Sequence, residues 1–282
     1  MQALWMLFAS VMFAIMGASV KLAAAGLPLP EVVLMRGLPI VIVLLIWARR
    51  SGRSLIPPSW RLHAVRNISG IASMWMSFYA ISHLSLATAT SLSYTSPLFI
   101  AAWVMWRSNT RDSLRIAALF IGFIGVLILL RPSVTEDQWV PAMIGLAGGA
   151  LMAVAYLGLR VLGQAGEPEW RTVFYFALSA SLSGLVMLPV TGWVSPGMDG
   201  WLALLSMAGS GMLGQFAVTR AFGRGSALLS AALQYSTIVF SAGLGYLFWN
   251  DAPDALGWAG MGLIVLAGLI STWCTRRDKG KA

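Results

Sequence analysis

Ten long apolar runs, separated by short polar segments, constrain the fold of this chain more than any other feature of its sequence. Each run spans about 20 residues, the length that an α-helix needs to cross the hydrocarbon core of a bilayer. The predicted helices cover residues 3–25, 30–48, 67–84, 86–106, 114–131, 139–163, 172–191, 200–219, 226–248 and 255–274. We therefore expect an all-α integral membrane protein with ten transmembrane helices and no soluble domain.

The composition excludes a water-soluble fold. Of the 282 residues, 58% are hydrophobic and only 10% are charged, and the mean hydropathy is +0.78. Soluble domains carry about 25% charged residues, and disordered chains combine low hydrophobicity with high charge. The 29 glycines and 13 tryptophans suit a chain whose helices pack through small residues and whose indoles lie at the membrane surfaces.

The net charge of +9 reflects topology rather than nucleic-acid binding, because the basic residues form no stripe interleaved with aromatic residues. Sixteen of the 19 basic residues fall in loops or the tail on one side of the predicted membrane. Lys21 and Arg131 lie on the other side, and Arg36 lies within a helix. Basic loops face the cytoplasm. The sequence therefore predicts a multi-pass protein of the bacterial inner membrane with both termini cytoplasmic.

Features of enzymes and cofactor-binding proteins are weak in this sequence. Cys274 is the lone cysteine, and the two histidines are expected in a loop and a turn, so we expect no metal site and no cofactor. Residues 209–214 match G-x-G-x-x-G, but no strand precedes them, so helix packing is the favoured interpretation. An intramembrane enzyme remains a remote alternative, because no carboxylate pair or buried histidine is expected.

The chain also contains an internal repeat at an offset of 141 residues, half its length. The offset aligns residues in two separated regions: Ala9 with Ala150, Ala14 with Ala155, Gly17 with Gly158, Ser85 with Ser226, Leu92 with Leu233, Tyr94 with Tyr235 and Phe99 with Phe240. Two halves of five helices each must enter the membrane from opposite sides, as in secondary transporters. We expect two inverted five-helix repeats, residues 1–135 and 136–282.

The layout resembles the EamA family of the drug/metabolite transporter superfamily. The residues that carry the resemblance are Arg36, the segment Ser93-Tyr94-Thr95-Ser96-Pro97-Leu98-Phe99, Gly122–Val126 and Gly262–Gly268. The chain departs from the family pattern at the ends of predicted helices four and nine, where Trp106-Arg107 and Trp249-Asn250-Asp251 replace Gly-Glu. Ile238 stands in the second half where the first has Pro97. Within the family, the chain is most similar to amino-acid exporters of the YddG type, which implies a transporter of small metabolites.

Two polar bands at the middle of the bilayer are candidates for the substrate site. Predicted helix four carries the first band and predicted helix nine the second, and Pro97 is a candidate hinge. Polar groups at this depth must face the bundle or a cavity. The alternative is that they only join helices through hydrogen bonds. The predicted substrate-binding residues of the two bands are Thr90, Ser93, Tyr94, Ser230, Gln234 and Tyr235.

Three aromatic residues and one arginine complete the predicted site. Trp75 and Tyr79 share a face of predicted helix three, and Tyr156 has a comparable depth in helix six. These rings either pack in the core or line a cavity for aromatic or hydrophobic substrates. Arg36 is a candidate partner for a substrate carboxylate. Its alternatives are extension to the outer surface or pairing with Glu31.

We therefore expect a monomeric exporter of small metabolites, foremost aromatic or hydrophobic amino acids, that works in the lipid bilayer by alternating access and binds no nucleic acid. Export of drugs, nucleosides or carboxylates is the alternative. A non-transporting scaffold would leave the two matched polar bands unexplained. The ten acidic residues fall at helix ends or in loops, which favours gradient-driven or exchange transport over obligate proton coupling, with Glu31 left open as a proton site.

Overall fold

The computed structural model describes residues 2–108, 114, 117–118, 120–125, 128, 136–224, 230 and 233–279. Every regular element among these residues is helical. The helices are α1 (Gln2–Ala24), α2 (Leu29–Arg50), α3 (Trp60–His83), α4 (Leu86–Ser93), α5 (Ser96–Ser108), a short 3-10 helix (Glu136–Gln138), α7 (Trp139–Gln164), α8 (Glu169–Thr191), α9 (Met198–Arg224), α11 (Ser236–Trp249) and α12 (Ala255–Lys279). Eight of the 18 residues of predicted helix five, Arg131 among them, lie outside the described residues, as does part of predicted helix nine.

Among the described residues, five helices are long and apolar enough to cross a membrane: α1, α2, α7, α8 and α9. Residues 236–249 and 255–267 form shorter apolar helices. Large hydrophobic side chains such as Val186, Val190 and Leu247 are exposed on the outer surface, as expected where lipid replaces water. The prediction of an all-α membrane protein is confirmed.

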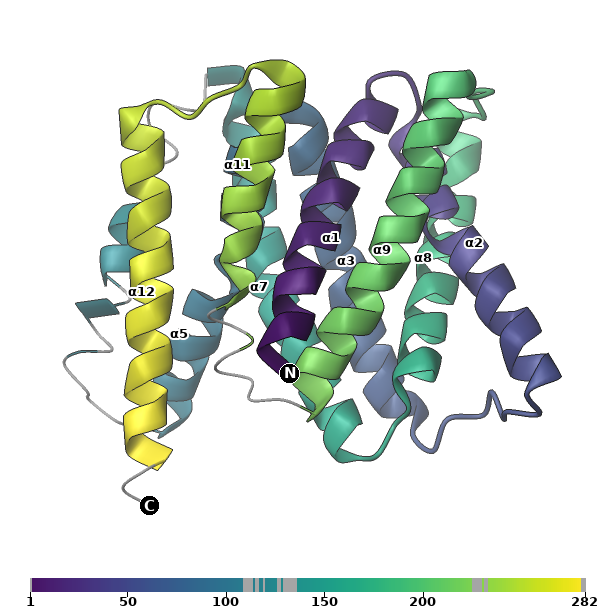
Figure 1. Cartoon of the computed structure of the whole chain (residues 1–282), viewed down its shortest axis with the longest axis horizontal. Helices are drawn as coiled ribbons and strands as arrows, with labels where there is room; N and C mark the ends of the chain where they lie inside the picture. The colour runs from purple at the N-terminus through teal and green to yellow at the C-terminus, as the bar shows by residue number, and fades with distance from the viewer. Residues whose placement is uncertain are drawn as a thin grey trace.

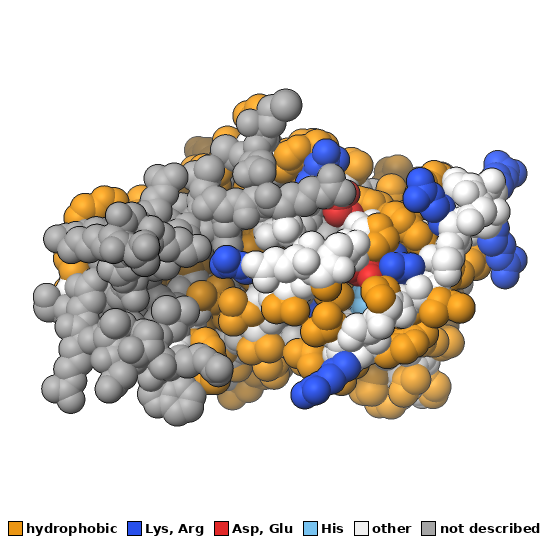
Figure 2. Space-filling view, turned by 90° about the horizontal axis from the view of Figure 1, so that it is seen from below, with side chains coloured by type: hydrophobic (Ala, Val, Ile, Leu, Met, Phe, Trp, Pro, Cys, Tyr) orange, Lys and Arg blue, Asp and Glu red, His pale blue; other side chains and the backbone are white. Residues whose placement is uncertain are grey.

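The helices stand side by side, and α1 begins at the end of the bundle where α12 finishes (Figure 1). We call this the terminal end and the other the opposite end. Figure 2 views the terminal end, where lysine and arginine side chains surround a small acidic and histidine centre. At the opposite end, the described residues include one lysine or arginine, Lys21.

The packing of the helices follows a two-fold pattern. In the observed structure, α1 packs along α9, α3 packs along α7, and α2 packs along α8. If α7, α8 and α9 repeat α1, α2 and α3, the two-fold operation exchanges the α1–α9 pair with the α7–α3 pair. The same operation exchanges α2 with α8, so the α2–α8 pair maps onto itself. The turns agree, because α1 ends at Ala24 and α2 begins at Leu29, whereas α7 ends at Gln164 and α8 begins at Glu169. The first turn lies at the opposite end and the second at the terminal end, as inverted repeats require.

Small residues allow these pairs to approach closely. A Cβ atom on Gly184 of α8 would lie 2.6 Å from the backbone nitrogen of Leu34 and 2.7 Å from the carbonyl oxygen of Pro30, both on α2. Within the 209–214 segment of α9, a Cβ on Gly214 would lie 3.0 Å from the ring of Phe13 on α1. This glycine-rich segment therefore packs helices together, as predicted.

Candidate functional site

The predicted fourth helix is broken at the middle of the bundle. Its first part, α4, ends at Ser93, Tyr94 and Thr95 form a turn, and α5 begins at Ser96. Pro97 lacks an N–H group, so it cannot donate to the carbonyl of Ser93 as an uninterrupted helix requires. The hydroxyl of Thr95 turns back to donate to the carbonyl of Leu92 at 2.7 Å. The break therefore lies just before the predicted hinge residue.

The second half is broken at the equivalent position. Tyr235, which the 141-residue offset aligns with Tyr94, is a turn residue between the helical residues 233–234 and α11. The backbone N–H of Ile238 donates to the carbonyl of Tyr235 at 3.0 Å. The break therefore forms here without a proline, because Ile238 occupies the position of Pro97. Broken helices at mid-depth place backbone and side-chain polar groups at substrate sites of transporters.

Helices from both halves support the two breaks. A Cβ on Gly149 of α7 would lie 2.8 Å from the carbonyl oxygen of Leu92 and 2.6 Å from the hydroxyl of Thr95, so only glycine fits beside the first break. The hydroxyl of Ser10 on α1 donates to the carbonyl of Leu233 beside the second break at 3.4 Å. The breaks also meet each other, since the Gln234 amide donates to the Ser96 hydroxyl at 3.5 Å.

A cavity of about 90 Å³ lies beside these breaks, between the two halves. Its walls come from α1, α2, α3 and α4 of the first half and from α7, α8, α9 and α11 of the second. The polar and charged groups in the wall are Arg36, Arg66, Ser77, Thr90, Ser93, Tyr94, Tyr156, Gln215 and Thr237. The remainder of the wall is mostly apolar, including Phe13, Met74, Phe78 and Met152. Such a mixture suits an organic molecule with a few polar groups.

Five of the predicted substrate-binding residues line this cavity: Arg36, Thr90, Ser93, Tyr94 and Tyr156. The structure thus brings together the arginine of α2, the first polar band and the aromatic residue of α7. Ser93 also donates to the hydroxyl of Ser77 at 3.1 Å, which fixes its orientation. Tyr156 stacks on Phe222 with ring centroids 4.7 Å apart. Their contact with a substrate remains a prediction.

The other predicted residues lie outside the cavity wall. The Trp75 indole donates to the Ser183 hydroxyl at 3.0 Å, so it joins α3 to α8. Tyr79 lies about one turn before the last residue of α3, His83, and packs against it with ring centroids 4.3 Å apart. In the second band, Ser230 donates to the carbonyl of Ala221 at 3.1 Å. Gln234 and Tyr235 are buried beside the second break, where Gln234 bonds to Ser96 and Tyr235 packs in the apolar core.

Arg36 is buried, with 2% of its surface exposed, and it neither reaches the outer surface nor pairs with Glu31. Its Nε and Nη1 atoms have no hydrogen-bond partner, and its guanidinium carbon lies 4.9 Å from the centroid of the Phe176 ring. Glu31 is buried in the first turn of α2, where one carboxylate oxygen accepts from the backbone of Val194 at 3.0 Å. Both structural alternatives to a substrate role of Arg36 are therefore wrong.

Arg66 also lines the cavity, although the sequence predicted that it lies in a loop. Predicted helix three begins at residue 67, but α3 begins at Trp60, so Arg66 lies nearly two turns inside the helix rather than in a loop. It is 3% exposed, its Nε and Nη1 atoms have no partner, and its guanidinium carbon lies 3.9 Å from the Phe176 centroid. Two glycines were the sequence signal for a buried Arg66. Gly70, one turn later on α3, and Gly158 on α7 leave the space that the Arg66 side chain occupies.

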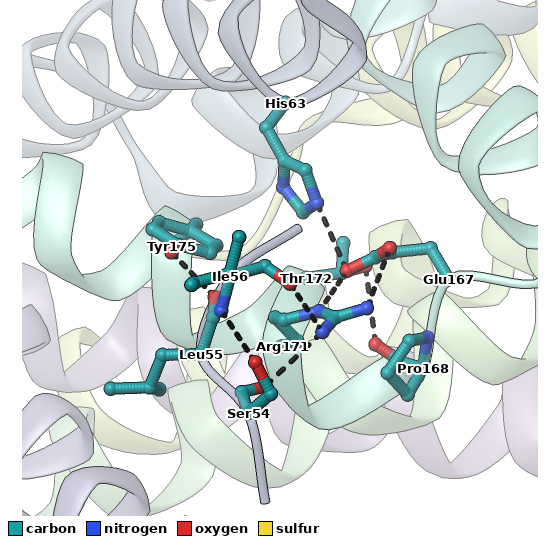
Figure 3. A network of polar contacts seen from close by, with 9 residues as sticks. All are labelled: Ser54, Leu55, Ile56, His63, Glu167, Pro168, Arg171, Thr172 and Tyr175. Carbon is teal, nitrogen blue, oxygen red and sulfur yellow. Dashed lines mark hydrogen bonds and ion pairs between the residues drawn. The ribbon is translucent and has the colours of Figure 1, made fainter. Parts of the chain in front are cut away.

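The two halves are joined at the terminal end by a network of polar contacts (Figure 3). Glu167, in the turn between α7 and α8, accepts hydrogen bonds from Arg171 and lies 3.1 Å from Nε2 of His63 on α3. Arg171 also donates to the carbonyls of Ser54 and Ile56 at 3.1 and 2.8 Å. The α2–α3 loop is thereby held against α8 below the cavity.

A second junction lies at the opposite end. The ammonium of Lys21 on α1 donates to the carbonyl of Leu84 at 3.1 Å and lies 3.7 Å from a carboxylate oxygen of Asp251, which follows α11. It also lies 5.1 Å from the ring centroid of Trp249. Contacts between the halves therefore flank the cavity on both sides. Within the described parts of the chain, no group of three or more His, Cys, Asp or Glu side chains could hold a metal ion.

An all-helical membrane protein with broken helices around a central cavity is the architecture of a small-molecule transporter. The model of the EamA-like transporter family matches residues 1–131. The chain is 33% identical over 260 residues to the pseudopaline exporter CntI of Pseudomonas aeruginosa, covering 92% of this chain and 91% of that protein. The protein belongs to the EamA-like transporter family.

Two further comparisons agree with this assignment. The riboflavin transporter of Vibrio cholerae is 26% identical over 286 residues, covering 98% of this chain and 95% of that protein. A crystal structure with 20% identity superposes with a TM-score of 0.70 over 98% of both chains, which shows a shared fold. The protein is therefore a transporter of small molecules rather than an enzyme, as the sequence predicted. The comparisons do not distinguish a specificity of the YddG type.

Proposed function

We propose that the protein exports small carboxylate-bearing metabolites, amino acids foremost, across the bacterial inner membrane. The observation that carries this proposal is Arg36, a buried guanidinium with unpartnered donors in the wall of the central cavity. Arginine binds carboxylates through two parallel, charge-assisted hydrogen bonds. The direction of transport follows the similar protein that is named an exporter.

The aromatic part of the amino-acid proposal rests on fewer residues than the sequence suggested. Tyr94 and Tyr156 line the cavity, whereas Trp75 and Tyr79 do not. The apolar walls still suit a hydrophobic side chain, and drugs, nucleosides and other carboxylates remain the alternatives. We propose that the protein acts as a monomer in the bilayer, with both termini cytoplasmic and the halves divided at residues 135 and 136.

Alternating access is the proposed mechanism. The junctions at the two ends both connect the first half to the second: His63 with Glu167 at one end, and Lys21 with Asp251 at the other. If each junction opens in turn while the halves rock about the cavity, the substrate reaches one side at a time. The breaks before Pro97 and at Tyr235 lie at the pivot of this motion, and the first break contributes Ser93 and Tyr94 to the polar lining.

The proposal is tested by transport into and out of proteoliposomes containing the purified protein. A panel of labelled amino acids, nucleosides, organic acids and cationic drugs is assayed with the wild-type protein, Arg36→Gln and Arg49→Gln. Arg49 is the matched control because it is exposed at the terminal end of the same helix. Carboxylate flux that is lost in Arg36→Gln and kept in Arg49→Gln supports the proposal. Flux confined to compounds without a carboxylate, or equal in both variants, refutes it.

A further inference from the structure

Two arginines, rather than one, lie against the cavity, and they share a single aromatic ring. The guanidinium carbons of Arg36 and Arg66 lie 4.9 and 3.9 Å from the centroid of Phe176. The two carbons therefore cannot be farther apart than 8.8 Å, the sum of these distances. Arg36 comes from α2 and Arg66 from α3, so the fold brings together two cations from separate helices.

The contact with Phe176 orients the two guanidinium groups and leaves their Nε and Nη1 donors without a hydrogen-bond partner. A cation over the face of an aromatic ring is held through the ring's negative quadrupole, whereas its N–H groups point outward in the guanidinium plane. Nε and Nη1 of both arginines are buried without a hydrogen-bond partner. Because unpartnered buried donors are costly, the arrangement suits a group that accepts hydrogen bonds from both arginines.

The charges of the cavity wall identify that group. Among the described residues that line the cavity, Arg36 and Arg66 are charged, and none is Asp or Glu. Arginine keeps its proton in proteins, so the described wall carries two positive charges without a compensating carboxylate. A zwitterionic amino acid brings no net charge, and its ammonium group meets two cations. A dianion neutralises both guanidinium groups.

The chain also reserves space for the second arginine. A Cβ on Gly70 would lie 2.8 Å from Nη1 of Arg66 and 3.1 Å from the Phe176 ring. A Cβ on Gly158 of α7 would lie 3.0 Å from the Cβ of Arg66. Glycines on two helices thus admit the Arg66 side chain, from its stem to its guanidinium, into the protein interior.

We propose that the substrate of this transporter is a dianionic organic acid, whose acid groups Arg36 and Arg66 bind together at the face of Phe176. Two carboxylates a few bonds apart match the two guanidinium groups, and a phosphate monoester offers the same charge on one group. The apolar wall around Met74, Phe78 and Met152 accommodates the organic body. This inference rests on the proposed export of carboxylate-bearing metabolites, and within that class it favours dianions over the zwitterionic amino acids that Arg36 alone would suit.

The test compares dianions with matched compounds of lower charge. Proteoliposomes with wild-type protein, Arg66→Gln, Arg66→Lys or Arg61→Gln are assayed with succinate, glutarate, phenylsuccinate and phenyl phosphate, and with benzoate, phenylalanine and phenethylamine. Arg61 is the matched control because it is exposed on the same helix. The thermal shift that each compound produces in detergent-solubilised protein measures binding independently of transport.

The expected result is transport and thermal stabilisation by dianions with the wild type and Arg61→Gln. Arg66→Gln should lower dianion flux by at least about tenfold, the loss expected when one charge-assisted contact is removed, and Arg66→Lys should restore part of it. The ratio of benzoate flux to dianion flux should rise in Arg66→Gln, which a merely structural role would not cause. The carboxylate and phosphate compounds show which acid group is preferred.

Two results would overturn the inference in distinguishable ways. If wild-type protein moves phenylalanine or phenethylamine but neither binds nor moves any dianion, the assignment of the charge class is wrong while the transport function stands. If it moves no compound of either panel in either direction, the proposed function itself fails. Equal effects of Arg66→Gln and Arg61→Gln on dianion flux would also refute the role of Arg66.

Discussion

The guanidinium carbon of Arg66 lies 3.9 Å from the centre of the Phe176 ring, in a wall of the central cavity. This contact joins α3 of the first half to α8 of the second, and Arg36 approaches the same ring from α2. Three helices thus meet at one aromatic side chain. Their polar donors face a space between the halves, where a transporter must hold its substrate.

The cost of the unpaired charge at Arg66 gives the first prediction. Arg66→Met keeps a long side chain but removes a buried cation whose desolvation no carboxylate offsets. We expect the substrate-free protein to be more stable by about 1–3 kcal/mol and its transport activity to be lost. Thermal unfolding in detergent measures this, with Arg61→Met as the exposed control. A variant that unfolds at a clearly lower temperature would indicate that Arg66 has a stabilising partner.

The space beside Arg66 gives the second prediction. In Gly70→Ala the added Cβ meets Nη1 of Arg66 at 2.8 Å, so the end of this flexible side chain must shift from its position against Phe176. We expect a higher KM with little change in stability, because the displaced atoms belong to side chains rather than backbone. Gly209→Ala is the matched control, since nothing lies within 4 Å of its added Cβ. Equal KM values in the two variants would contradict the proposed position of the guanidinium.

The sequence predicted much of the fold because the apolar runs report directly on contact with lipid. The predicted boundaries of the first two helices, 3–25 and 30–48, agree closely with α1 and α2. The 141-residue offset also placed Tyr94 and Tyr235 at equivalent positions, and both proved to be turn residues. A pattern that repeats along the chain can be recognised in the sequence without knowledge of the tertiary contacts.

The start of α3 was harder to predict. The first turns of α3 contain Arg61, His63, Arg66 and Asn67, and this polar run looks like a cytoplasmic loop. Partner helices nevertheless bury His63, Arg66 and Asn67, and Arg61 alone of the four is exposed. Hydropathy does not distinguish a charge in water from a charge facing a cavity. Trp75 was misleading for a related reason: its partner, Ser183, lies on a helix distant in sequence.

The hydrogen bond of Trp75 gives the third prediction. Trp75→Phe removes the indole donor and leaves the Ser183 hydroxyl without this partner, so we expect a loss of stability of about 1 kcal/mol. Because Trp75 does not line the cavity, the order of preference among substrates should not change. Competition assays with the substrate panel measure that order, and Tyr94→Phe is the variant expected to alter it. A new order in Trp75→Phe at unchanged stability would place the indole in the substrate site.

The junction at the terminal end gives the fourth prediction. Glu167→Gln replaces the charged acceptor of Arg171 and weakens contacts that hold the α2–α3 loop to α8. We expect a loss of stability of about 1–3 kcal/mol and faster entry of water-soluble reagents from that end. The measurement is the rate at which a thiol reagent labels Met74→Cys in a Cys274→Ser background. Asp199→Asn, exposed at the start of α9, is the control.

Slower or unchanged labelling in Glu167→Gln would show that this junction does not restrict access to the cavity. The corresponding change at the opposite end, Asp251→Asn, removes the carboxylate 3.7 Å from Lys21. If the halves alternate, the two substitutions should favour access from opposite sides. Labelling from the same side in both variants would therefore argue against alternating access.

An experimental structure of the protein with a compound that it transports would show whether the two arginines hold its acid groups. We expect one carboxylate of a dicarboxylate beside each arginine, or a single phosphate between them, within hydrogen-bond distance of Nε or Nη1 of Arg36 and of Arg66 and beside the Phe176 ring. A compound bound elsewhere in the bundle, or bound in this cavity with a cationic or neutral group facing the two arginines, would contradict this expectation.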